Sequence, residues 1–239
     1  MPIQSSHAIV RKCKESLWKL IFDHKQAGTL NLDQPIKILF DQSENLIGDM
    51  LVNTVAFRAL KRAHSDWTIH VLAGGVNRDI IRTNPNVDRI HTFAGTLSAI
   101  RRLRQEKFDI YYFHKNRLKL DDFILLKYIG SRVNLGRNKD RFRLFDYSID
   151  EPAETEVDRY VQFLNFLGID DIDCRYDLHL TQEELSWGRS YVNTLSGWPI
   201  IVFNRYGNRR GKLFGRARAK QLIAEIDRVY PGAVLARSG

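Results

Sequence analysis

The feature that most constrains the fold is an alternation of short apolar runs with helical patterns. The run IKILF at residues 36–40 is followed by an amphipathic pattern over 49–64. Similar strand-like runs lie at 67–72, 90–93, 109–113 and 133–135, with helical patterns between them at 97–107 and 118–129. Because strands that alternate with helices build βαβ units, the sequence predicts an α/β fold with a parallel sheet covered on both faces.

The chain after residue 140 is organised differently. An irregular stretch, 140–155, precedes patterns that predict further elements: helices at 156–167, 181–195 and 216–230, and strands at 176–180, 200–203 and 233–236. The last two helices and two strands are too few for an α/β domain of their own, because a parallel sheet needs several strands and cover on both faces. We therefore predict a whole first domain over 35–180 and the beginning of a second over 181–239.

An amphipathic helix is predicted at residues 6–27, within an N-terminal extension that covers 1–34. Its apolar residues recur at steps of three and four, and Gly28 is expected to end it. The apolar positions are Val10, Cys13, Leu17, Leu20 and Ile21. Packing against the flank of the domain is favoured, and contact with an anionic membrane surface is the alternative.

Composition restricts the function. The chain has 239 residues, 44% of them hydrophobic, and no apolar run long enough to span a membrane. Its two cysteines are too few for a disulfide framework, which favours a reducing cytoplasm, and no CxxC or HExxH spacing supports a zinc site. The net charge of +9 points to an anionic partner, against the alternative of a merely basic surface.

The first candidate site follows the strand at 36–40. Gly48 would let a ligand approach the backbone, and Asp49 would bring a carboxylate to the carboxyl end of the strand, where ligands bind in parallel sheets. Such a carboxylate can act as a general base. The alternative is that Asp49 only caps the following helix.

The second candidate site is the glycine-containing basic loop after the strand at 200–203. Residues 204–220 hold seven Lys or Arg and no acid, which suits a phosphate or diphosphate. Its spacing is not that of a P-loop. The alternative is a solvated basic face.

A third group of basic residues follows the strands at 109–113 and 133–135. An acceptor that carries several phosphates or carboxylates would fit it, whereas ordinary surface cations are the alternative. The candidates are Lys115, Arg117, Lys119, Arg137, Lys139 and Arg141. The histidines at 64, 70, 91 and 114 are scattered, and we interpret them as surface or packing residues.

Several segments resemble family 9 glycosyltransferases, the ADP-heptose:lipopolysaccharide heptosyltransferases. The resemblance runs from residue 36 to 239 through IKILFDQSENLIGDMLVNTVAFRALKRAHSDWTIHVL, NPNVDRIHTF, FDIYYFHKNRLK and PIIVFNRYGNRRGKLFG. It implies a GT-B-like fold, with an acceptor-side Rossmann-like domain and an incomplete donor-binding one. It also implies inverting transfer of a heptose from ADP-heptose to a lipopolysaccharide core, a phosphorylated glycolipid, without a metal.

By position, the resemblance makes Asp49 the catalytic base and Lys212 the residue that steadies the donor diphosphate. Asn204, Arg209, Arg210 and Gly48 are assigned to the donor as well. The chain departs from the family where Leu213-Phe214 follow Lys212, and it lacks the family's later nucleotide-contacting segment. Two alternatives therefore stay open: a non-catalytic truncated product, and a nucleic-acid binder, although no stacking aromatics or reader motif support the latter.

Overall fold

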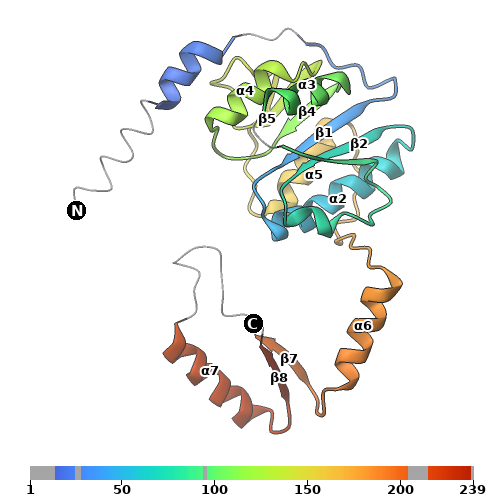
Figure 1. The fold of residues 1–239 in the computed structure, drawn as a ribbon, viewed down its shortest axis with the longest axis vertical. Coiled ribbons are helices and arrows are strands. Elements are labelled where there is room, and N and C mark those ends of the chain that lie inside the picture. The colour runs from blue at the N-terminus through green and yellow to red at the C-terminus, as the bar shows by residue number, and fades with distance from the viewer. Residues whose placement is uncertain (1–13, 25–27, 94–95, 204–214, 238–239) are drawn as a thin grey trace, which may run out of the picture. The chain divides into compact units, whose positions relative to one another are not determined.

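The computed structural model describes residues 14–24, 28–93, 96–203 and 215–237 (Figure 1). Residues 235–237 are described by their backbone only. It divides into two compact units, Met1–His179 and Leu180–Gly239. Within the described residues, no helix combines the length and the apolar character needed to cross a bilayer.

Unit 1 contains a six-stranded, fully parallel sheet in the order β3-β2-β1-β4-β5-β6. The strands are β1 Lys37–Gln42, β2 Thr68–Ala73, β3 Arg89–Thr92, β4 Ile110–Phe113, β5 Val133–Arg137 and β6 Tyr147–Ile149. This order is that of a doubly wound Rossmann-like sheet, which confirms the predicted fold class. Strand β6 lies in the irregular stretch 140–155, for which the sequence predicted no strand. It is only three residues long, too short for its pattern to be recognised in the sequence.

Helices cover both faces of the sheet (Figure 1). Helices α2 Ile47–Ala63 and α5 Glu156–Phe166, with the short η1 Asn77–Ile80, pack on one face. Helices α3 Leu97–Gln105 and α4 Leu120–Tyr128 pack on the other. Alternate residues of each central strand, such as Phe40 and Leu39 of β1, enter the two separate cores.

Three aspartates join neighbouring strands at their amino ends. Asp88, Asp109 and Asp146 each stand just before a strand, and each carboxylate accepts a hydrogen bond from a backbone N–H in the first two residues of the neighbouring strand, at 2.7, 2.9 and 2.8 Å. Each aspartate's own N–H in turn donates to the same neighbouring residue. The aspartates in NPNVD and FDIYYF are thereby explained by the sheet.

The N-terminal helix covers residues 14–22 of the described chain and packs on α4. It ends six residues before Gly28, so the prediction that Gly28 ends this helix is wrong. At Gly28 the chain passes against β5, and a Cβ atom there would lie 1.8 Å from the carbonyl oxygen of Arg132. Glycine is needed for this close approach. Residues 6–13 and 25–27 of the predicted helix lie outside the described part.

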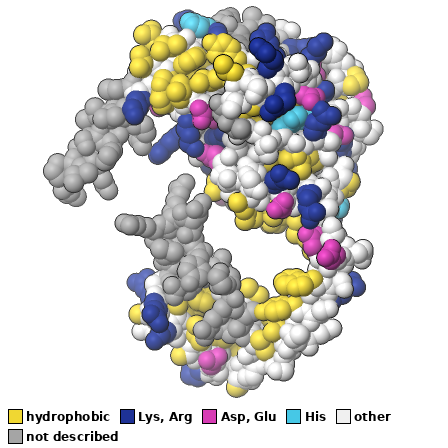
Figure 2. Space-filling model, in the orientation of Figure 1, with side chains coloured by type: hydrophobic (Ala, Val, Ile, Leu, Met, Phe, Trp, Pro, Cys, Tyr) yellow, Lys and Arg dark blue, Asp and Glu magenta, His cyan; other side chains and the backbone are white. Residues whose placement is uncertain are grey.

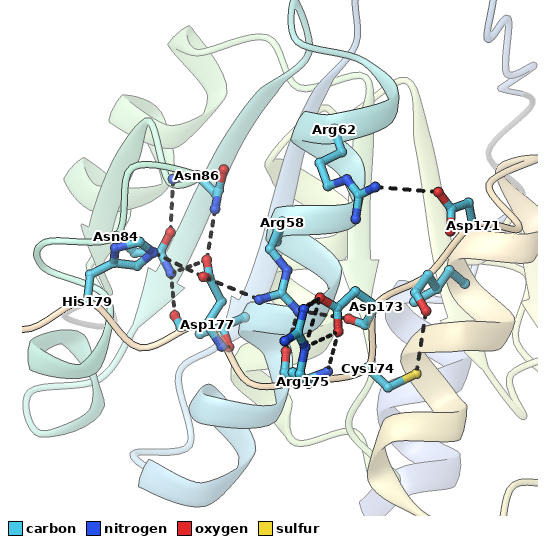
Figure 3. A network of polar contacts seen from close by, with 12 residues as sticks. Arg58, Arg62, Asn84, Asn86, Asp171, Asp173, Cys174, Arg175, Asp177 and His179 are labelled. Carbon is cyan, nitrogen blue, oxygen red and sulfur yellow. Dashed lines mark hydrogen bonds and ion pairs between the residues drawn. The ribbon is translucent and has the colours of Figure 1, made fainter.

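Residues 169–179, before unit 2, form an irregular segment that lies across unit 1, and the predicted strand at 176–180 does not form (Figure 3). Its backbone is satisfied by side chains: the Asp177 N–H donates to the Thr54 hydroxyl at 2.9 Å, and the Asp177 carbonyl accepts from Asn84 at 2.9 Å. Arg58 of α2 donates to the carbonyl of Asp173 at 2.9 Å. These partners replace a sheet ladder, which is why an apolar run here makes no strand.

Unit 2 has α6 Gln182–Asn193, β7 Ile200–Phe203, α7 Arg216–Val229 and β8 Val234–Arg237. Strands β7 and β8 pair in parallel. Among its described side chains, Ala219 is the one that is buried, whereas Trp187 is 70% exposed. The apolar side chains of this unit therefore build little core within the described chain.

Candidate functional site

The strand order reverses between β1 and β4, and the carboxyl ends of these two strands mark the topological switch point. In open α/β sheets the ligand crevice lies at this edge. The loop from β1 to α2, the loop from β4 to α4, and α5 supply the side chains there. The candidate site is therefore built from three segments that are distant in sequence.

Asp49 lies in the first turn of α2 and is half-buried. The helix begins at Ile47 after an N-cap residue, Leu46, that makes no side-chain cap. The interpretation of Asp49 as a simple N-cap is therefore wrong, and its carboxylate lies within the first turn of the helix, where the helix dipole favours negative charge. Apart from its chain neighbours and the adjacent helix backbone, no atom of the described residues lies within 4 Å of the position that a Cβ on Gly48 would take, so the surface beside Asp49 is open there.

The loop that precedes α2 is fixed to the end of β2 by two asparagines. Asn45 has a left-handed backbone conformation, and its side-chain oxygen accepts a hydrogen bond from the Val76 N–H at 2.9 Å. A Cβ on Gly74 would lie 2.0 Å from this oxygen, which explains the glycine. Asn77, fully buried, donates to the carbonyl of Gln42 at 2.8 Å. The loop before α2 is thus joined to the segment after β2 by two hydrogen bonds.

A buried polar cluster lies beside this loop and consists of Gln42, His114 and Tyr160. The Gln42 amide donates to the Tyr160 hydroxyl at 2.9 Å and lies 3.3 Å from Nδ1 of His114. Burial lowers the pKa of His114 to about 4, so its imidazole is neutral at neutral pH. Burial raises the pKa of Tyr160 well above 10, and the charge of Asp49 adds to this shift. The Asp49 carboxylate therefore interacts electrostatically with the Tyr160 hydroxyl.

Asn53, one helical turn after Asp49, is a residue that the sequence analysis missed. It is fully buried, and among the described residues neither its amide nitrogen nor its amide oxygen has a hydrogen-bond partner. Positions four apart share one face of a helix. A buried, unsatisfied amide costs about 1–3 kcal/mol, and native proteins tolerate that cost chiefly for a reason such as function. An asparagine four residues after Asp49 was the only sequence signal.

Lys115, predicted to bind the acceptor, lies inside the protein between two carboxylates. Its ammonium is 2.9 Å from Asp41 and 2.8 Å from Asp122, and both acids are buried. Burial opposes the charge of Asp41, but Lys115 and hydrogen bonds from Tyr111 and Ser43 leave the pKa of Asp41 below its usual value. These contacts give Lys115 a structural role, and acceptor binding by it stays a prediction.

The other predicted acceptor cations fall into two groups. Arg137 and Lys139 are buried: the former donates to Gln162 and to the carbonyl of Glu151, and the latter to the carbonyl of Arg137 at 2.8 Å. Burial lowers the pKa of Lys139 to about 8. The exposed group is Arg117, Lys119 and Arg141, of which Lys119 pairs with Glu44 and Arg141 with Glu15. Arg117 and Lys119 come from the loop after β4, at the edge that carries the candidate site.

Four of the five donor-side residues of the sequence analysis lie outside the described residues, whereas the fifth, Gly48, is in the first turn of α2. The four are Asn204, Arg209, Arg210 and Lys212. Their predicted role in binding a diphosphate stays a prediction. The described residues place β7 directly before this loop and α7 after it, which is the strand-to-helix position that the sequence indicated.

His70 and His91 are brought together by the register of β2 and β3, which the sequence analysis did not foresee. His91 Nε2 lies 2.9 Å from His70 Nδ1, and with Glu106 they offer three ligand atoms within 4.8 Å of one another. Burial, followed by the neighbouring His91, lowers the pKa of His70 to about 4. However, Arg89 donates to the Glu106 carboxylate, and Lys37 lies 3.7 Å from it. Two cations beside the only anionic ligand oppose a metal ion there.

This chain is similar to known proteins in structure, whereas the comparisons of its sequence found no match. No family model matches the chain, and it has no significant match among curated proteins. Solved structures match: the glycosyl transferase family 9 protein from Veillonella parvula DSM 2008 has 18% identity and a TM-score of 0.65, over 87% of this chain and 64% of that one. The E. coli ADP-heptose lps heptosyltransferase II has 20% identity and a TM-score of 0.62, over 84% and 64%.

The E. coli heptosyltransferase WaaC with ADP gives 15% identity and a TM-score of 0.59, over 85% of this chain and 67% of that one. The resemblance inferred from the motifs is confirmed at the level of the fold, which is GT-B-like with a Rossmann-like first domain. The chain spans about 64% of the length of the first two structures.

Proposed function

We propose that this protein is a glycosyltransferase that moves a heptose, or a related sugar, from ADP-heptose to a lipopolysaccharide core acceptor with inversion. The observation that carries the proposal is the position of Asp49, in the first turn of α2 at the switch-point edge of a sheet shared with heptosyltransferases. The reaction needs no metal or cofactor in this scheme. Its substrates imply a cytoplasmic protein that acts on a phosphorylated glycolipid.

In the proposed mechanism, Asp49 takes the proton of the acceptor hydroxyl while that oxygen attacks the anomeric carbon. The bond to the ADP leaving group breaks from the opposite side, which inverts the configuration. His114 is neutral and Tyr160 keeps its proton, so Asp49 is the anionic base beside them. Lys212, with Asn204, Arg209 and Arg210, would compensate the charge on the leaving diphosphate. Gly48 gives the substrate room at the helix start.

The test compares Asp49→Asn with wild type in a transfer assay with ADP-heptose and a heptose-deficient lipopolysaccharide acceptor. We expect kcat to fall about a hundredfold or more, because the amide cannot accept the proton. Affinity for ADP, measured by calorimetry, should stay at the wild-type value. The matched control is Asp79→Asn, an exposed aspartate on η1, which should transfer as wild type does.

Normal turnover in the Asp49→Asn variant would remove this residue from the role of base. Loss of ADP binding together with turnover would instead assign Asp49 to the donor.

A second candidate is a non-catalytic chain that keeps the acceptor-side fold. The sparse core of unit 2, where Ala219 is the buried one among the described side chains, favours it. Calorimetric titration of ADP and ADP-heptose into the wild-type protein distinguishes the two. Binding of both ligands supports the transferase, and binding of neither supports the non-catalytic chain.

A further inference from the structure

The N-terminal helix, residues 14–22, has two apolar sides, and only one of them is used by the fold. On the inner side, Trp18 and Phe22 contact Phe123 of α4, with ring centroids 6.3 and 6.5 Å apart. Both aromatic side chains are partly buried against the α3–α4 core. The helix is therefore held on unit 1 by a conventional packed face.

Polar contacts fix the helix in this orientation. The Asp23 carboxylate accepts a hydrogen bond from the Leu144 N–H at 2.8 Å, and Lys19 donates to the carbonyl of Arg141. Arg141 in turn pairs with Glu15 at 2.6 Å. Because these contacts come from both ends of the helix, the outward side stays outward.

The outward side carries a ridge of three aliphatic residues, Leu17, Leu20 and Ile21, which are 54%, 78% and 52% exposed. They stand at spacings of three and four, so they adjoin one another on the helix surface. Figure 2 shows a hydrophobic patch over this part of unit 1, beside Lys and Arg side chains. Exposed faces of surface helices are normally polar, so this ridge is unusual for a side that nothing in the described fold covers.

The N-terminal segment that carries the ridge has a net positive charge in sequence. Residues 1–27 contain five Lys or Arg against Glu15 and Asp23. Both acids are engaged by unit 1, the first by Arg141 and the second by the Leu144 N–H. Lys14 is exposed on the helix, and Arg143 is exposed on the segment beside it. An anionic surface would meet cations without meeting free carboxylates from this helix.

We propose that the Leu17–Leu20–Ile21 ridge docks the protein on an anionic lipid surface. Short apolar ridges flanked by lysines and arginines insert between lipid headgroups, where no shape complementarity is required. A stable protein–protein interface needs about 1,000 Å² or more, which three side chains do not supply. The charge pattern selects acidic over neutral lipid. This inference does not depend on the transfer reaction, although it suits a glycolipid acceptor.

The experiment is sedimentation of the full chain with vesicles of phosphatidylcholine and phosphatidylglycerol, or of phosphatidylcholine alone. Wild type should bind the mixed vesicles about tenfold more tightly, and added salt should weaken that binding. Leu20→Glu should lower binding to the mixed vesicles by about tenfold or more, because it removes a leucine that the lipid would bury and adds charge repulsion. Its thermal unfolding should match wild type, since Leu20 points outward.

The matched control is Val76→Glu. Val76 is 56% exposed and precedes η1, on the face of the sheet opposite the N-terminal helix. This variant should bind vesicles as wild type does, as should Asp49→Asn, which separates docking from the proposed chemistry.

Wild-type binding that does not distinguish the vesicles, or equal binding by Leu20→Glu, would overturn the proposal. A concentration-dependent dimer that Leu20→Glu dissociates, seen by analytical ultracentrifugation, would overturn it in favour of a second copy on the ridge.

Discussion

Lys115 and Lys119 stand four residues apart, and their surroundings differ completely. The ammonium of Lys115 is buried between Asp41 and Asp122, whereas that of Lys119 is exposed and lies 3.1 Å from Glu44. Removing one member of a buried charge group leaves the others uncompensated, while an exposed pair is screened by water. The two residues look alike in sequence, and the difference comes from burial alone.

We expect Lys115→Met to lower the free energy of unfolding by about 3–5 kcal/mol, because it leaves two buried carboxylates without their cation. Lys119→Met should cost about 1 kcal/mol or less. Denaturant titration of both variants measures these values. Equal losses would mean that the buried network does not stabilise the fold.

His114 gives a prediction for the dependence of stability on pH. Its pKa is about 4 in the folded protein and 6.5 ordinarily, so between these values the unfolded chain binds a proton that the native state does not. The free energy of unfolding should therefore fall as the pH falls from about 6.5 to 4, by up to about 3 kcal/mol from this residue. Denaturant titrations at pH 7, 6 and 5 test this.

His114→Gln should reduce that slope without abolishing it, because the pKa of His70 is also lowered to about 4. A His114→Gln protein as acid-sensitive as wild type would contradict the assignment.

At the scale of elements, the sheet is joined at its amino end by aspartates. Asp109 accepts from the Lys37 N–H at 2.9 Å, and Asp88 and Asp146 make the equivalent bond beside β2 and β5. A backbone N–H at the start of a strand has no partner in the ladder, so a neighbouring carboxylate satisfies it. The aspartates in the segments NPNVD and FDIYYF therefore join neighbouring strands at the amino end of the sheet. The candidate site lies at the opposite, carboxyl end.

Asp109→Ala should lower the free energy of unfolding by about 1–3 kcal/mol, because the partly buried Lys37 N–H loses its acceptor. Asp66→Ala, in an exposed turn, should change it by less than about 0.5 kcal/mol. Thermal or denaturant unfolding of the two variants makes the comparison. If Asp66→Ala lowered the free energy of unfolding as much as Asp109→Ala does, the strand-joining hydrogen bond would not be the cause of the loss.

At the scale of the whole molecule, the apolar core is concentrated in unit 1. Its four central strands are almost entirely buried, while α6 has no buried residue and α7 has one, Ala219. Local stability follows the density of buried contacts. The two units should therefore differ in how often their backbone amides open.

Hydrogen exchange should show strong protection in β1, β2, β4 and β5 and weak protection in α6 and α7 of the isolated chain. The ratio of exchange rates should exceed about a hundredfold, since opening of the core strands requires near-global unfolding. Adding ADP should increase protection in unit 2 if that unit binds the donor. Equal protection of both units would contradict the unequal distribution of core.

Most of the fold could be predicted because strand and helix periodicities are local. The apolar runs gave β1, β2, β4 and β5, and the capping residues Thr155 and Thr181 mark the starts of α5 and α6. The strand expected at 176–180 failed because its apolar pattern does not reveal that side chains from α2 and from the segment after η1 satisfy its backbone. The position of Asp49 at the start of the helix that follows β1 was predicted from the sequence, whereas its role as a base stays a prediction.

What the sequence alone determined is the order of strands and helices, since a residue's local pattern depends on its neighbours in the chain. Only the tertiary structure decided which cations are buried, such as Lys115, and which residues meet, such as Gln42 with His114 and Tyr160. Those outcomes depend on crossovers that bring β1 and β4 together across some seventy residues. Burial and long-range contact set the electrostatics of a site, and neither is written in local spacing.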